Sequence, residues 1–167
     1  MVKRMEATIP KPAVRQAMSN EDARRRRLLQ RRVCAVVLAG VSAQTTWEIL
    51  EKAPWVFTVG GPRIIMIPAT RHSELRRWLW THGFAFVADR PVQAAGRWYA
   101  VMAAEYTGER HEPTFPECLL GSTGSWPEGA GYAAWQKAKL PRMRLGVPDG
   151  TPLADEIDRL LKEGTGL

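Results

Sequence analysis

The sequence has few of the features that would anchor a protein in a membrane or cross-link it. Its longest apolar run, residues 33–39, is far shorter than the roughly 20 residues that cross a bilayer, so we expect no membrane association. The first 30 residues lack the apolar stretch of a secretory leader, which makes a cytoplasmic location the expectation. The two cysteines, Cys34 and Cys118, lie far apart, and the three histidines show no ligand spacing. We therefore predict no disulfide and no metal site.

Glycine is absent from residues 1–32, and acidic residues are scarce there. This segment holds ten of the 24 basic residues and three of the 17 acidic ones, so it carries the whole net charge of +7 and leaves the rest of the chain neutral. Ser19 is a suitable helix cap for a basic helix that ends near residue 32. We interpret residues 1–32 as a basic N-terminal arm. Its candidate phosphate contacts, with a solvated helix end as the alternative, are Arg24, Arg25, Arg26, Arg27, Arg31 and Arg32.

From residue 33 the pattern predicts alternating strands and helices. Residues 33–39 form a β-branched apolar run that ends at Gly40, which indicates a parallel strand buried on both faces. A helix over 44–53, a strand over 64–67 and a helix that ends near Gly83 follow. Residues 84–89 and 98–104 predict an antiparallel pair joined by a turn region of six to eight residues. The fold class is therefore α/β, a partial Rossmann-like sheet of parallel strands with an antiparallel closing hairpin.

The last third of the chain differs in composition. Residues 107–131 are rich in Gly, Pro, Ser and Thr, and short helices are predicted over 132–139 and 154–162. We expect three parts: the arm over 1–32, half of an α/β domain over 33–106, and a loop-rich extension with short C-terminal helices over 107–167.

Several motifs, in the same order along the chain, resemble the TrmK-type bacterial tRNA (adenine-N1) methyltransferases. Val36-Val-Leu-Ala-Gly-Val-Ser-Ala43 resembles that family's apolar strand followed by Ala-Gly-Met-Gly-Gly. Ile64-Ile-Met-Ile-Pro-Ala69 with Glu74-Leu-Arg-Arg-Trp-Leu79 resembles its Leu-Gln-Pro strand end and its Leu-Arg-x-Trp-Leu helix. Gly96-Arg-Trp-Tyr99 and Pro116-Glu-Cys-Leu-Leu-Gly121 resemble its closing strand and a later acidic stretch.

The resemblance implies a Rossmann-like enzyme that transfers a methyl group from S-adenosylmethionine (SAM) to an adenine of tRNA. It implies that the loop after the first strand lies beside the methyl donor and the target base. On that basis Ala39, Gly40 and Val41 are candidate cofactor-binding residues, and Ser42 and Pro68 are candidate substrate residues. The motifs identify no catalytic side chain, because such a reaction depends mainly on the alignment of an already activated donor.

Two departures from the family pattern affect the functional prediction. No strand and no Gly-rich turn precede residue 33, so the half that holds SAM is not recognisable. The family's Met-Gly-Gly is Val41-Ser42-Ala43 here, which adds Cβ atoms where a ligand would approach. We therefore expect a truncated or split methyltransferase that is not active alone. The alternative is a noncatalytic RNA-binding or protein-interaction module derived from the same fold.

The missing half also has a structural consequence. The strand over 33–39 would be an exposed hydrophobic edge, which is a template for pairing. We expect the arm, a second copy of the chain or a partner chain supplying the first half to cover it.

Overall fold

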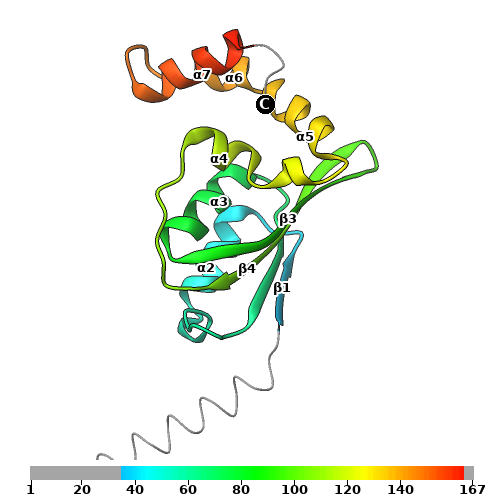
Figure 1. Ribbon diagram of the computed structural model, residues 1–167, viewed down its shortest axis with the longest axis vertical. Helices are drawn as coiled ribbons and strands as arrows, with labels where there is room; N and C mark the ends of the chain where they lie inside the picture. Colours follow the sequence, from blue (N-terminus) through cyan, green and yellow to red (C-terminus); the bar gives the residue numbers. More distant parts are fainter. Residues whose placement is uncertain (1–34, 164–167) are drawn as a thin grey trace, which may run out of the picture. The chain divides into compact units, whose positions relative to one another are not determined.

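The computed structural model describes residues 35–163, and the basic arm with the six arginines predicted to contact phosphate lies outside the described residues. Strands and helices alternate up to residue 106, and helices follow (Figure 1). The strands are β1 (Ala35–Ala39), β2 (Arg63–Ile67), β3 (Phe84–Ala94) and β4 (Arg97–Tyr106). The helices are α2 (Ala43–Glu51), α3 (His72–Thr81), α4 (Phe115–Leu120), α5 (Gly129–Lys137), α6 (Leu140–Leu145) and α7 (Pro152–Lys162), with 3-10 turns η1 (Pro54–Val56) and η2 (Thr123–Ser125).

The four strands form one sheet in the order β1-β2-β4-β3. β1 and β2 are parallel, whereas β4 is antiparallel to both of its neighbours. This arrangement confirms the predicted α/β class, with parallel strands closed by an antiparallel hairpin. β1, β2 and β3 therefore end at the same edge of the sheet, and the loops after β1 and β2 lie side by side there.

The main core lies between the sheet and the two crossover helices. Leu50 of α2 and Leu75 and Leu79 of α3 pack with Met66 of β2 and Met102 of β4, and all five side chains are at most 1% exposed. Burial of each such side chain contributes roughly 1.5–3 kcal/mol relative to an exposed one. The core therefore fixes the position of the loops that leave β1 and β2.

β1 differs from the prediction that its strand is buried on both faces. Its side chains alternate between half-buried and exposed, and Val37 is 62% exposed. The reason is its place in the sheet: among the described strands β1 pairs only with β2, so it is an edge strand. A β-branched run indicates a strand but does not by itself tell a central strand from an edge.

The hairpin between β3 and β4 is tighter than predicted. Its turn consists of Ala95 and Gly96, both at positive φ (48° and 72°), as a type I′ turn requires. β3 continues through Pro91, which pairs with Ala100. A proline is compatible with this strand because β3 lies at the other edge of the sheet formed by the four described strands, where none of them pairs with its outer side.

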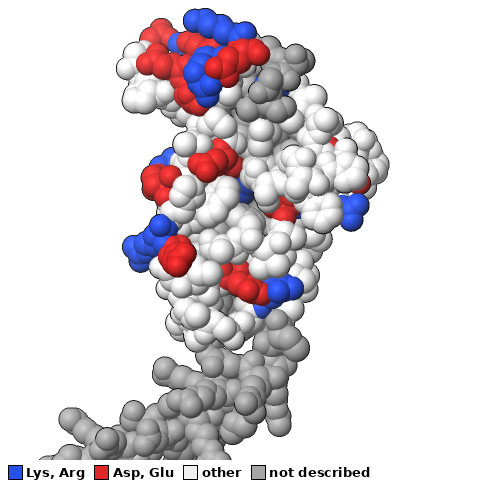
Figure 2. All heavy atoms as spheres, viewed as in Figure 1, with Lys and Arg blue, Asp and Glu red and all other residues white. Residues whose placement is uncertain are grey.

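The segment after β4 contains more helix than the composition predicted. α4 begins at a capping box, in which the Thr114 hydroxyl and the Glu117 carboxylate bond each other's backbone N–H groups. α6 and α7 pack around Leu140, Ile157 and Leu160. Figure 2 shows charged side chains of both signs gathered over α6 and α7, where Arg144 and Arg159 each pair with two carboxylates.

Replacing Ala95 with Asn should stabilise the chain by about 0.5–1 kcal/mol, because Asn tolerates the left-handed conformation better than Ala. Urea unfolding measures the change. Ala94→Asn, one position earlier in the strand, is the control and should bring no gain. Equal effects of the two variants would contradict the turn assignment.

Candidate functional site

The loops that leave β1 and β2 lie side by side at the carboxyl edge of the sheet. The Gly40 N–H donates to the Ile67 carbonyl at 3.1 Å, and the Ala69 N–H donates to the Val41 carbonyl at 2.9 Å. These two bonds extend the strand pairing into the loops. The candidate cofactor residues 39–41 and the candidate substrate residues Ser42 and Pro68 therefore lie together at one edge, where ligands of open α/β sheets bind.

Gly40 faces open space. Its φ is +75°, and a Cβ added there would meet no atom within 4 Å. Ala39 and Gly40 are exposed, and Val41 is half-buried. The end of β1 therefore leaves room for a ligand beside the backbone.

Ser42 has a structural task that the motif did not indicate. Its hydroxyl accepts the Thr45 N–H at 3.0 Å and so caps α2. The hydroxyl also lies 2.9 Å from that of Thr45. Ser42 thus starts α2 directly behind the candidate cofactor residues, and its contact with a substrate stays a prediction.

Pro68 connects the edge to the interior. Its ring is buried, and its carbonyl lies 3.2 Å from His72 Nε2. Because a carbonyl can only accept, this nitrogen of His72 carries the proton, and Nδ1 at 3.1 Å accepts from the Tyr132 hydroxyl. A chain of hydrogen bonds therefore runs from α5 to the loop after β2.

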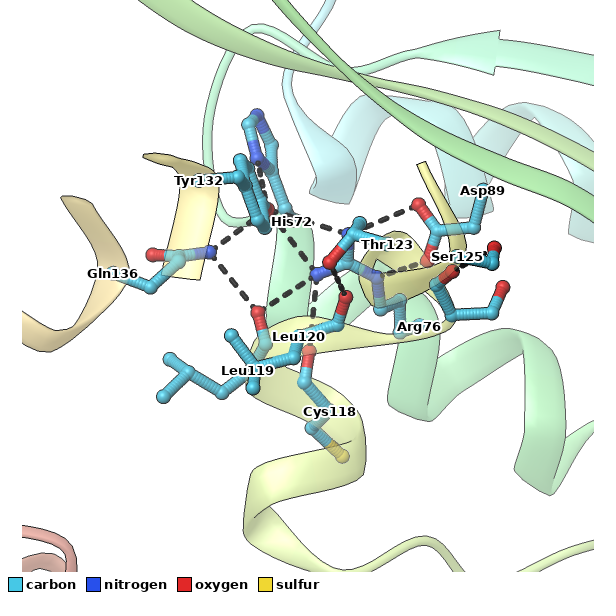
Figure 3. Close-up of polar contacts among 11 residues, drawn as sticks. His72, Arg76, Asp89, Cys118, Leu119, Leu120, Thr123, Ser125, Tyr132 and Gln136 are labelled. Carbon is cyan, nitrogen blue, oxygen red and sulfur yellow. Dashed lines mark hydrogen bonds and ion pairs between the residues drawn. The ribbon is translucent and has the colours of Figure 1, made fainter. Parts of the chain in front are cut away.

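A buried ion pair lies at the centre of this polar network (Figure 3). Arg76 of α3 and Asp89 of β3 are both fully buried, and the two side chains meet at 2.7 and 3.0 Å. Burial opposes the charge of Arg76, but Asp89 raises its pKa above the ordinary value. Arg76 also donates to the carbonyls of Cys118 and Leu119 at 3.2 and 3.0 Å. The guanidinium thus joins α3 and β3 to α4.

Tyr132 closes the network from the side of α5. Its hydroxyl accepts from Arg76 at 3.3 Å and from Gln136 at 2.8 Å while it donates to His72. Burial raises the pKa of this phenol. Gln136 also donates to the Leu119 carbonyl at 3.1 Å. Every polar group of the network therefore has a partner, which offsets the cost of burying it.

Gly121 makes the close approach of α4 to the ion pair possible. A Cβ at this position would lie 1.9 Å from Asp89 Oδ2 and 2.5 Å from Arg76 Nε, and its φ is +59°. Only a residue without a side chain fits there. The glycine that ends α4 is thus part of the packing around the pair.

Burial sets the protonation of His72. Burial, followed by the charges of Arg76 and Lys139, lowers its pKa from 6.5 to about 4. His72 is therefore neutral near pH 7, as the hydrogen bonds to Pro68 and Tyr132 require.

The sequence did not indicate this network, although it held one signal. His72 and Arg76 are four residues apart, and Arg76 lies beside Leu75 and one turn before Leu79, on the buried stripe of α3. A charge on that stripe predicts a buried partner. Within residues 35–163, no group of three or more His, Cys, Asp or Glu side chains could hold a metal ion. No helix in the same range is long and apolar enough to span a bilayer.

Comparison with known families identifies the class of protein. The family model described as a methyltransferase domain matches residues 3–102, which is more than half of the chain. The chain therefore belongs to the methyltransferase domain family. A comparison with curated proteins finds no match.

Several solved structures are similar to this chain in fold. A Streptococcus pneumoniae protein in complex with S-adenosyl-L-methionine is 21% identical, with a TM-score of 0.60, and the match covers 79% of this chain and 60% of that one. The M1A22 tRNA methyltransferase TrmK of B. subtilis is 20% identical (TM-score 0.54; 78% and 58% covered). TrmK of M. capricolum in complex with S-adenosyl-homocysteine is 17% identical (TM-score 0.53; 77% and 57% covered). The predicted resemblance is confirmed, and the chain spans about 60% of the length of these structures.

Gly121→Ala should destabilise the chain by about 3 kcal/mol or more, because the added methyl group separates Asp89 from Arg76 and leaves buried charges poorly paired. Gly150→Ala is the matched control, since Gly150 also has a positive φ (+73°) and a Cβ there meets no atom within 4 Å. Thermal and urea unfolding compare the two. A Gly121→Ala protein as stable as the control would show that the ion pair tolerates displacement.

Stability should fall as the pH falls from about 6.5 to about 4. In this window the unfolded chain binds a proton at His72 that the folded chain does not, and the shift corresponds to about 3 kcal/mol. Urea unfolding of the chain and of His72→Gln at pH 7, 5 and 4 measures the effect. The variant should lose less stability between pH 7 and 4, and parallel curves would contradict the assignment of a buried neutral His72.

Proposed function

We propose that the chain forms the substrate-side part of a SAM-dependent methyltransferase that acts on N1 of an adenine in tRNA. The observation that carries the proposal is the open carboxyl edge at Gly40, which the sheet order β1-β2-β4-β3 brings beside the loop after β2. The solved relatives with this sheet include tRNA methyltransferases and proteins with SAM or its product bound.

The loops at this edge fit one side of SAM. Open space beside Gly40 can admit the reacting end of the cofactor, and the exposed backbone of Ala39 and Gly40 would line it. Neither loop, residues 39–43 or 67–71, contains a carboxylate for the ribose hydroxyls. The ribose and amino-acid ends would need groups from another part of the enzyme.

The residues of this chain would act by alignment. When bound, SAM supplies an activated methyl group, so the protein needs no strong nucleophile of its own. The backbone at Gly40 and Val41 would set the depth at which an adenine enters, and Ser42 would fix that loop to α2. His72 would hold the Pro68 carbonyl, and with it the second wall of the site.

The exposed edge of β1 offers a place where a further strand could pair and bring the groups that the ribose and amino-acid ends of SAM would need. Val37 is 62% exposed on a strand with one described neighbour, and the strand carries no charge or proline to prevent pairing. A further strand that pairs with β1 would continue the parallel sheet. The arm over 1–32, a second copy of the chain or a partner polypeptide that supplies the first half would thus cover this edge.

The basic arm would contribute to RNA binding. Its arginines can neutralise tRNA phosphates, and such contacts make affinity depend on salt. The same feature supports the second candidate function, a noncatalytic RNA-binding module, since it requires no cofactor.

Titration of the full-length chain with SAM and with an unmodified bacterial tRNA separates the two functions. We expect tRNA to bind, and SAM to bind weakly because the loops over 39–43 and 67–71 hold no carboxylate for its ribose hydroxyls. Gly40→Ala should weaken SAM binding by about tenfold, because its methyl group fills the open space. Gly60→Ala is the control, since Gly60 has a similar φ of +73° and equal open space at another turn.

The titration with each ligand leads to a separate conclusion. Binding of tRNA without any SAM binding favours the noncatalytic module. Absence of both excludes the methyltransferase proposal for this chain. Mass spectrometry of the digested tRNA, for N1-methyladenosine formed in the presence of SAM, tests catalysis directly.

A further inference from the structure

Lys139, two residues after the end of α5, is held against an aromatic ring. Its Nζ lies 2.9 Å from the ring centroid of Trp135, one turn earlier. Its other polar contact is the Gln136 side-chain oxygen at 3.2 Å. The ammonium is thus fixed in place by neutral groups, through a cation–π contact and a hydrogen bond.

Among residues 35–163, Lys139 forms no ion pair with a carboxylate. The surface arginines Arg63, Arg77, Arg144 and Arg159 each pair with a carboxylate. In the part of the chain that the structure describes, no carboxylate lies within ion-pair distance of Lys139. The side chain is only half-exposed, and this burial lowers its pKa to about 8. A partly desolvated cation without a counterion favours the binding of an anion.

The position of Lys139 ties this cation to the candidate site. The Trp135 ring lies 6.0 Å from the His72 ring, centroid to centroid, and 5.5 Å from that of Tyr132. His72 in turn holds the Pro68 carbonyl at the carboxyl edge. The charge of Lys139 reaches His72 and contributes to its lowered pKa. A ligand at the edge that extends past Pro68 toward α5 would meet this ammonium.

We infer that Lys139, positioned by Trp135, binds a backbone phosphate of the RNA whose adenine enters at the carboxyl edge. The inference rests on the proposed function for the identity of the RNA. Among anions, a phosphodiester fits because it carries one charge per nucleotide along a chain, so one phosphate can sit at Lys139 while a nearby base lies at Gly40. The contact would fix the approach of the RNA without reading its sequence.

Lys139→Gln tests the contact by removing the charge and keeping much of the side chain. We expect its affinity for tRNA to fall by about tenfold, the loss of one charge-assisted contact, and the slope of log affinity against log salt to decrease by roughly 0.7–0.9. Lys139→Arg keeps the charge and should restore most of the affinity. Lys52→Gln is the matched control, since Lys52 caps the far end of α2 and its loss removes the same charge. Circular dichroism melts of all variants verify that they fold.

The outcomes separate this inference from the proposed function. If the chain binds tRNA and Lys139→Gln matches Lys52→Gln in affinity and slope, the phosphate contact is wrong and the proposed function stands. If the chain binds SAM but no tRNA, the phosphate contact alone is wrong, and if it binds neither ligand, both fail. Inorganic phosphate as competitor gives a second measure: wild-type tRNA binding should be more sensitive to it than that of Lys139→Gln, and equal sensitivity would overturn the contact.

Discussion

The Arg76–Asp89 ion pair is the interaction on which the arrangement after the sheet depends. Removal of two charges from water costs several kcal/mol per ion, and only close geometry with further hydrogen bonds compensates that cost. The chain supplies the compensation from three directions: Asp89 from β3, the carbonyls of Cys118 and Leu119 from α4, and Tyr132 from α5. Each of these three elements is thus held in place by its polar contact with the Arg76 guanidinium.

The same network joins stability to the candidate site. Tyr132 touches Arg76 on one side and His72 on the other, and His72 bonds the loop after β2. The loop that would form a wall of the site is therefore fixed through Asp89 of β3 and Tyr132 of α5, which lie at least 18 residues away in the sequence. A methyltransferase that works by alignment needs such rigidity more than it needs reactive side chains.

The sequence predicted the parts of the molecule that local patterns control. The apolar runs that became β1 and β2, the stripe Leu75-Leu79 and the final hairpin gave the α/β class and its order. The edge position of β1 and the two-residue turn between β3 and β4 depended on how the strands pair, which no local sequence pattern contains. The candidate loops were found through motifs, whereas Asp89 and Tyr132 lie in segments whose composition indicated only a strand and a short helix. Their role arises from contacts 13 and 56 residues away in the chain.

The carbonyl contacts of Arg76 also limit how the chain can be divided. A fragment that stopped at Tyr106 would retain all four strands and both crossover helices. It would nevertheless expose a guanidinium that loses two carbonyls and a phenol, and it would open the hydrophobic surface under α4. A unit suited to expression or to fusion with another polypeptide therefore extends at least through α5, well past the last strand of the sheet.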